Sequence, residues 1–148
     1  VLSGPDVKRR IRYKQSVSVG QVSQQLFADV RQLFQIGDRE GALISLERLI
    51  VLAPLNPAIE GFLDQNEDRL LQYYEKAFGP WSRALRVRAD GPRMPDGFFS
   101  VQKVAAVVQW LDGKRPLEVV FERAELRKIE CCAVVSQLVR SNAIDLSI

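Results

Sequence analysis

Three acidic side chains, Asp64, Glu67 and Asp68, come nearest in this sequence to the spacing of a catalytic carboxylate pair. Two carboxylates that flank a substrate can act as general acid and base, as they do in glycoside hydrolysis. Here the acids belong to a helical pattern whose opposite face is apolar, and a solvated helix surface has that same pattern. We therefore interpret them as surface residues.

Histidine is absent from all 148 residues, and this absence removes whole classes of chemistry. Without imidazole the chain lacks the most common general base, the nucleophilic triads that depend on it, and the common zinc sites. No glycine-rich phosphate loop is present. The stretch DGPRMPDG at 90–97 lacks the acid ladder and the closing glutamate of a calcium loop. We expect a protein that is not an enzyme and that holds neither a metal nor another cofactor.

The two cysteines, Cys131 and Cys132, are neighbours in a helical pattern. Adjacent helical residues point about 100° apart, so these thiols are poorly placed to bond to each other. They also lack the two-residue spacer of a zinc knuckle or a redox pair. We interpret them as small core or boundary residues of a protein in a reducing compartment, which predicts a cytoplasmic location.

The bulk composition is that of an ordinary globular protein. Hydrophobic residues make up 47% and charged residues 26%, which argues against wholesale disorder. A length of 148 suits one ordinary domain or two very small ones. The chain opens with VLSGP and its only methionine is Met94, so we expect a piece processed from a larger protein. No apolar run approaches the roughly 20 residues that span a bilayer, and we expect no membrane span.

The net charge of +3 is unevenly distributed along the chain. Residues 1–20 carry five basic side chains against one acid, whereas residues 21–79 carry five basic and nine acidic side chains. We expect residues 1–18 to form a basic arm or linker, either solvated or in contact with nucleic acid or another anion. The side chains that would make such a contact are Lys8, Arg9, Arg10, Arg12 and Lys14.

Hydrophobic spacing predicts three antiparallel helices over residues 19–79. The first ends at Gly37, because glycine adopts a positive φ at low cost. Asp38 is then placed as the N-cap of a second helix over about 39–52. Two prolines in LAPLNP end that helix, and the third helix starts at the second of them.

Residues of the first two helices recur at a recognisable spacing, namely Leu26, Leu33, Gly37, Ala42, Leu46 and Pro54. With this spacing, residues 23–56 resemble one tetratricopeptide repeat, a unit of about 34 residues that normally stacks with copies of itself. Ala42 would let the two helices approach closely. Val30 and Leu49 depart from the pattern, since the family has small residues there. The resemblance implies a repeat-like helical hairpin that the helix at 57–79 caps.

Glycine, proline and Asp-Gly pairs mark residues 80–97 as a linker. Within it, RALRVR alternates as a short half-buried strand would. We expect Trp81 to anchor this linker to the helices.

The last third, residues 98–148, returns to a helical pattern. One apolar stripe ends at Asp112-Gly113, a short helix starts at Pro116, and a longer helix covers about 125–141. The final NAIDLSI alternates like a strand. Three helices and a strand, with a tight join before the third helix, predict a helix-turn-helix of winged type.

The same stretch contains three matching elements, Asp112-Gly113-Lys114, Leu117 and Asn142-Ala143-Ile144. With them it resembles a winged-helix-like module of bacterial signalling proteins, notably myxobacterial ones. In that group the module often follows a repeat-like helical hairpin, and here the two together cover roughly residues 20–146. The resemblance implies a regulatory protein whose parent chain can include a receiver domain.

In tetratricopeptide-like units the first helix of the hairpin lines the concave face. The resemblance puts on that face Gln24, Phe27, Arg31, Phe34 and Gln35. Two phenylalanines flanked by an arginine and amides suit a groove for a peptide or a helix of another protein. The alternative is that both phenylalanines only contact the winged module or the helix at 57–79.

A helix-turn-helix also suits DNA, with the helix at 125–141 as the reading helix. The start of that helix, ELRKIE, mixes acids with bases, and residues 98–148 carry only seven basic side chains against six acids. Neutralisation of phosphates dominates DNA affinity, so this charge is low for the task. A nucleic-acid-binding transcription regulator, using the helix-turn-helix and the basic arm, is therefore our second hypothesis.

The sequence as a whole predicts a mostly α protein. We expect a repeat-like helical hairpin plus capping helix, packed with a small winged-helix-like module that has minor β structure. Its predicted function is that of a non-enzymatic interaction or adaptor domain in a bacterial signalling or cell-polarity protein. The expected partner is another protein, and the oligomeric state is left open.

Overall fold

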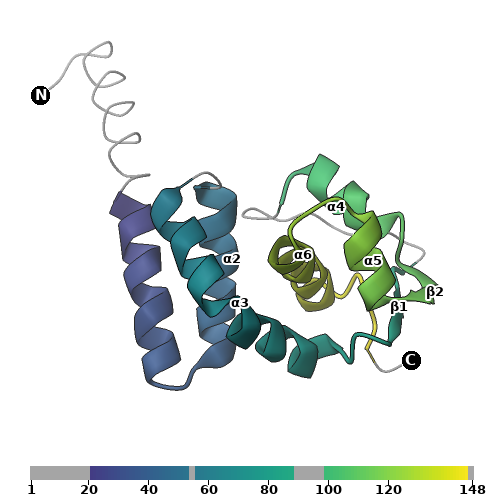
Figure 1. The fold of residues 1–148 in the computed structure, drawn as a ribbon, viewed down its shortest axis with the longest axis horizontal. Helices are drawn as coiled ribbons and strands as arrows, with labels where there is room; N and C mark the ends of the chain where they lie inside the picture. Colours follow the sequence, from purple (N-terminus) through teal and green to yellow (C-terminus); the bar gives the residue numbers. More distant parts are fainter. Residues whose placement is uncertain (1–20, 54–55, 89–98, 147–148) are drawn as a thin grey trace, which may run out of the picture. The chain divides into compact units, whose positions relative to one another are not determined.

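The computed structural model describes residues 21–53, 56–88 and 99–146. Within these ranges the protein is mostly helical, with one small two-stranded antiparallel sheet (Figure 1). The predicted class, mostly α with minor β, is confirmed. The chain divides between Ile59 and Glu60 into two compact units.

The first unit opens with a helix over residues 21–35 that ends in a tight turn. Gly37 takes a φ of +85° in this turn. Its N–H donates to the carbonyl of Phe34 at 3.2 Å, and the N–H of Asp38 donates to the carbonyl of Leu33 at 2.9 Å. This pair of bonds is a Schellman motif, in which a left-handed residue ends a helix. The predicted stop at Gly37 is confirmed.

Asp38 is the N-cap of α2 (Arg39–Leu52), as predicted. Its Oδ1 accepts a hydrogen bond from the N–H of Gly41 at 3.0 Å. Glycine at that position leaves room for the carboxylate, because a Cβ there would lie 2.5 Å from Asp38 Oδ2. α2 then buries a stripe of apolar residues, Ala42, Leu43, Leu46, Leu49 and Ile50.

The third helix, α3 (Pro57–Phe78), begins at the predicted proline. Just before it, the Oδ1 atom of Asn56 accepts from the N–H of Ala58 at 2.9 Å. The helix crosses the division between the units, so its first turn belongs to the first unit and its later turns to the second. The sequence had placed the division at residue 79, at the end of this helix.

The second unit adds a two-stranded sheet to helices. Its elements after α3 are β1 (Ala84–Arg86), α4 (Val101–Val108), β2 (Asp112–Pro116), α5 (Leu117–Arg123) and α6 (Lys128–Arg140). β1 and β2 are antiparallel, with Ala84 opposite Pro116 and Arg86 opposite Asp112 and an irregularity between them. Both strands lie at the end of the unit beside α5 (Figure 1).

The strand expected in RALRVR is present as β1. The strand expected in NAIDLSI is reduced to one bridge, between Val87 and Ile144. The N–H of Arg88 donates to the carbonyl of Ala143 at 2.8 Å beside this bridge. The last residues of the described chain therefore pair with the residues that follow β1.

β2 was not expected from the sequence, which read Asp112-Gly113 as the end of a helix. The Oδ1 atom of Asp112 accepts from the N–H groups of Lys114 and Arg115, each at 2.9 Å. Gly113 has a φ of +78°, and a Cβ there would lie 3.3 Å from Cβ of Arg86. The Asp-Gly turn is real, but it leads directly into a strand that pairs with β1.

α6 begins at Lys128, three residues later than expected. Glu125 lies in the turn between α5 and α6, with a φ of +57°. At the other end, Asn142 has a φ of +62° and Ala143 donates to the carbonyl of Leu138 at 2.9 Å, a second Schellman turn. The order α4, β2, α5, α6 and a terminal bridge is compatible with a winged arrangement, and that classification stays a prediction.

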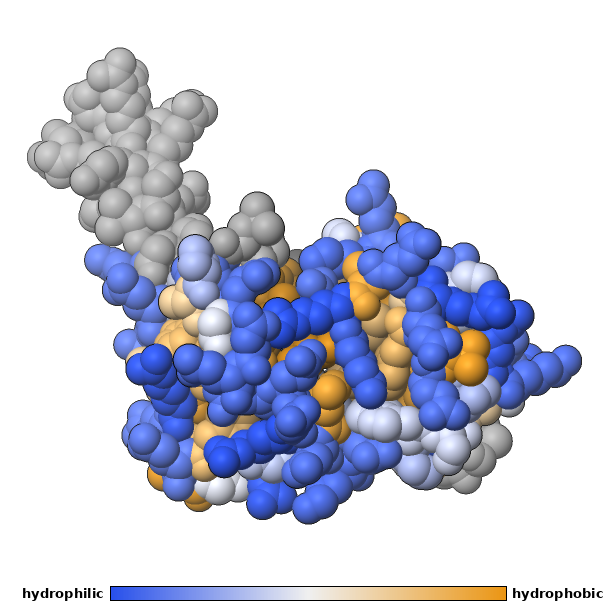
Figure 2. All heavy atoms as spheres, viewed as in Figure 1, coloured by the Kyte–Doolittle hydropathy of each residue, from blue (hydrophilic) through white to orange (hydrophobic). Residues whose placement is uncertain are grey.

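The core of the second unit is built around α6. Every residue from Cys131 to Leu138 is buried. Both cysteines are free thiols, and Trp81 packs against Phe121 with ring centroids 5.1 Å apart, so the linker is anchored at Trp81 as expected. On the face seen in Figure 2, hydrophilic side chains cover most of the surface and hydrophobic ones show between them.

Candidate functional site

A hollow of ≈ 450 Å³ lies in the first unit, between the helix over residues 21–35 and the start of α3. Three of the five predicted binding residues, Gln24, Phe27 and Arg31, line it. The spacing of three and then four residues places them on one face of the helix. The rest of the lining comes from Ser23, Asn56, Ala58 and Ile59.

Arg31 and Phe27 form the charged and aromatic part of this hollow. The guanidinium carbon of Arg31 lies 4.5 Å from the ring centroid of Phe27, within the range of a cation–π contact. Arg31 is exposed and Phe27 is half-buried, so both present surface to solvent. Asp29 belongs to the same helix but does not line the hollow. Its Oδ1 accepts a hydrogen bond from the side-chain amide of Gln25 at 2.9 Å.

The other two predicted residues, Phe34 and Gln35, do not line the hollow. Phe34 is half-buried and Gln35 is exposed, near the C-terminal end of the same helix. They continue the stripe of Phe27 and Arg31 by helical spacing alone. The structure thus brings three of the five residues together and leaves two beyond the hollow.

The hollow has an apolar floor and a polar rim. Ile59 is only 4% exposed, whereas Gln24 and Ala58 are exposed. Asn56 sits at the rim because its side chain caps the first turn of α3. Sequence reasoning missed the contribution of Asn56, Ala58 and Ile59, because these residues come to the first helix only through the fold.

The acids considered first, Asp64 and Glu67, interact with a base in the second unit. Asp64 pairs with the guanidinium of Arg127, and Glu67 Oε1 lies 3.9 Å from Nε of the same residue. Asp68 is exposed. These contacts connect α3 to the start of α6 within the second unit.

The basic residues at the start of the would-be reading helix have partners within the second unit. Arg127 binds the two acids of α3, and Nζ of Lys128 lies 5.3 Å from the ring centroid of Trp81. Lys103 of α4 bonds to Glu130 of α6 at 2.9 Å. The five side chains of the basic arm, from Lys8 to Lys14, lie outside the described residues.

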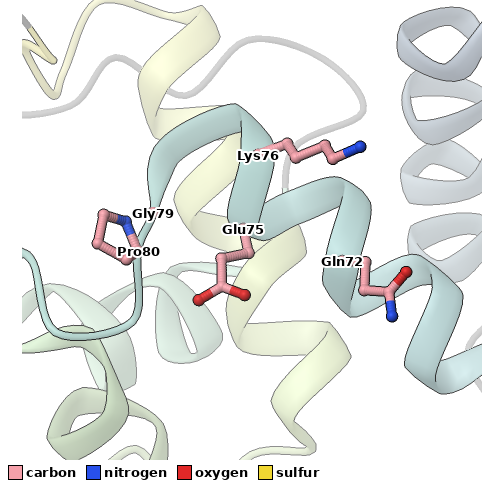
Figure 3. Close-up of a pocket in the computed structure, with 5 residues that line it drawn as sticks. All are labelled: Gln72, Glu75, Lys76, Gly79 and Pro80. Atoms are coloured by element: carbon pink, nitrogen blue, oxygen red, sulfur yellow. The ribbon is translucent and has the colours of Figure 1, made fainter.

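A second hollow, at the end of α3, is part of a structural turn. It is lined by Gln72, Glu75, Lys76, Gly79 and Pro80. Figure 3 shows the side chain of Glu75 on the side of the Gly79–Pro80 turn, while that of Lys76 points away. Glu75 accepts from the N–H of Trp81 at 3.2 Å, so this carboxylate holds the turn.

Cys131 is a buried thiol of α6. Burial, and next the charge of Glu130, raises the pKa of the Cys131 thiol to about 12. A thiol with such a pKa is protonated at neutral pH and is therefore a poor nucleophile. Among the described residues, no group of three or more potential ligands is placed to hold a metal ion.

A basic and aromatic cluster in the second unit was not foreseen. The guanidinium carbons of Arg115 and Arg123 lie 5.2 and 5.3 Å from the ring centroid of Trp110. Arg115 also bonds to Asp112 at 2.6 Å, and the pKa of Asp112 is lowered chiefly by the N–H groups of Arg115 and Lys114. Trp110 is half-buried under these cations.

No helix in the described part of the chain has both the length and the apolar character needed to cross a bilayer. Comparisons with protein-family models, with curated proteins and with solved structures found no match to this chain.

Proposed function

We propose that this protein is an interaction module whose first unit binds a segment of another protein. The bound segment would lie in the hollow against Gln24, Phe27 and Arg31, with Phe34 and Gln35 extending the contact along the helix. An aromatic side chain, an arginine and exposed amides around an apolar floor are the composition that peptide-binding surfaces favour.

The observation that carries this proposal is the hollow itself. It occurs at the surface that the sequence singled out, and its volume falls within the range of about 300 to 1,000 Å³ that is usual for binding sites. In line with the resemblance described above, the proposed role is that of a cytoplasmic adaptor domain of a bacterial signalling or cell-polarity protein.

A nucleic-acid regulator remains the second hypothesis. Arg127 and Lys128, which a reading helix would need at its start, have partners within their own unit. Nucleic-acid binding would then depend chiefly on the basic arm at residues 1–18. The contacts of these two residues therefore favour a protein partner over DNA.

The test is an affinity capture from nuclease-treated lysate of the source cells. We expect a partner protein to stay bound to the wild-type chain. Arg31→Glu should reduce the amount captured at least tenfold, because the change removes a cation and adds an acid at the hollow. Phe27→Ala should reduce capture as well, since it removes the aromatic wall.

The matched control is Arg48→Glu, the same charge change at an exposed position of α2 outside the hollow. Circular dichroism and thermal melting of all three variants separate lost binding from lost folding. Capture that Arg48→Glu weakens as much as Arg31→Glu does would reject the hollow as the site. Capture that disappears with nuclease would favour the nucleic-acid hypothesis.

A further inference from the structure

The charges around the hollow restrict what can occupy it. Arg31 is a cation, and none of the described residues that line the hollow is acidic. Arg31 also has no ion pair with any residue in the described ranges. The hollow thus offers a positive charge that the described part of the chain leaves unneutralised.

The contact with Phe27 limits how a ligand can approach this charge. The guanidinium carbon lies over the ring, 4.5 Å from its centroid. The N–H groups point outward in the guanidinium plane and remain available for a bidentate bond to a carboxylate. The oxygen of a neutral amide can accept one hydrogen bond from the guanidinium, but this bond is weaker because the amide carries no negative charge.

The rest of the lining favours a ligand that carries an apolar side chain close to its carboxylate. Phe27, Ala58 and Ile59 form the apolar part of the hollow. Phe27 lies four residues before Arg31, a separation of about 6 Å along the helix axis. Their contacting groups lie closer, 4.5 Å apart, so a bound segment that touches both needs an acid and a bulky apolar side chain that are neighbours on one face. This corresponds to four residues in a helix or two in an extended strand.

We infer that the occupant of the hollow is an acidic segment of a partner protein, with an Asp or Glu two or four residues from a bulky apolar residue. The inference rests on the proposed function and adds the chemistry of the partner. The acid bonds to Arg31, and the apolar side chain contacts Phe27 over Ile59.

The test is selection from a library of random 12-residue peptides displayed on phage, with the full-length chain as bait. We expect the selected peptides to contain Asp or Glu at one position about fivefold more often than the library, which corresponds to a partly exposed ion pair. A bulky apolar residue should occur two or four positions away. Selection on Arg31→Glu should replace the acid by Lys or Arg at the same position.

Arg48→Glu is the control bait, and it should select the acidic peptides of the wild type. Enriched peptides without acids, or acidic peptides that Arg31→Glu selects equally well, would overturn the inference while leaving a peptide-binding function standing. Absence of any enriched sequence on wild-type and variant baits would remove the inference together with the proposed function. Synthetic peptides from each selection, measured by fluorescence anisotropy, give the ratio of affinities.

Discussion

At the scale of single residues, Cys131 shows how burial changes chemistry. The sequence indicated a small core residue, and the structure buries the thiol completely beside Glu130. Loss of water disfavours the thiolate, so the pKa rises from 9.0 to about 12. The same burial that makes Cys131 unreactive makes the stability of the fold depend on pH in the alkaline range.

Cys131→Ala should flatten that dependence. Below pH 9 the thiol keeps its proton in both states, so its titration leaves the free energy of unfolding unchanged. Between pH 9 and about 12 the unfolded chain loses the proton and the folded chain does not, so stability falls as pH rises. From pH 8 to pH 10 the wild type should lose about 1.3 kcal/mol more than the variant.

Urea unfolding of both proteins at the two pH values measures this difference. Other groups that titrate in the same range contribute equally to both proteins and cancel. Equal losses in the wild type and in Cys131→Ala would mean that the thiol is not shielded from water as the structure has it.

At the scale of elements, local capping sets where helices start and stop. Gly37 and Asn142 each end a helix with a positive φ, and Asp38 and Asn56 hold the first turns of the helices that follow them. These signals are local, because each side chain or φ angle acts on backbone groups within a few residues. For this reason the sequence predicted α2 and α3 almost to the residue.

Asp38→Ala should destabilise the protein by about 1 kcal/mol, because the N–H of Gly41 loses its partner in the first turn of α2. The free energy of unfolding in urea measures this loss. Asp68→Ala provides a control, since it removes the same charge from an exposed position inside α3 and should change stability by less than about 0.5 kcal/mol. A loss no larger for Asp38 than for Asp68 would show that the cap contributes nothing.

At the scale of the molecule, contacts distant in sequence decide what the charged residues do. Arg127, at the start of α6, meets Asp64 and Glu67 of α3 about sixty residues earlier in the chain. From the sequence alone, the acids were a solvated surface and Arg127 belonged to a possible DNA-reading helix. Their mutual contact pairs all three charges within the second unit.

A double-mutant cycle on Arg127→Ala and Asp64→Ala should give a coupling of about 0.5 kcal/mol that falls as salt is added. The value is small because Asp64 is largely exposed, with 68% of its side chain accessible. Unfolding of the two single variants and the double variant measures it. The same cycle with Asp68 in place of Asp64 should give no coupling, and an equal coupling for both acids would point to general charge effects rather than a specific pair.

The sequence by itself determined most of the helices, the start and end of α2, the start of α3 and the short strand β1. These features depend on hydrophobic spacing and on capping, which act between residues close in the chain. Tertiary structure alone decided β2, which has the composition of a turn and becomes a strand because β1 pairs with it. It also supplied the other wall of the hollow, since Asn56, Ala58 and Ile59 reach the first helix only after α2 has reversed the chain. Strand pairing and pocket walls require partners far apart in sequence, and no local pattern records which segments will meet.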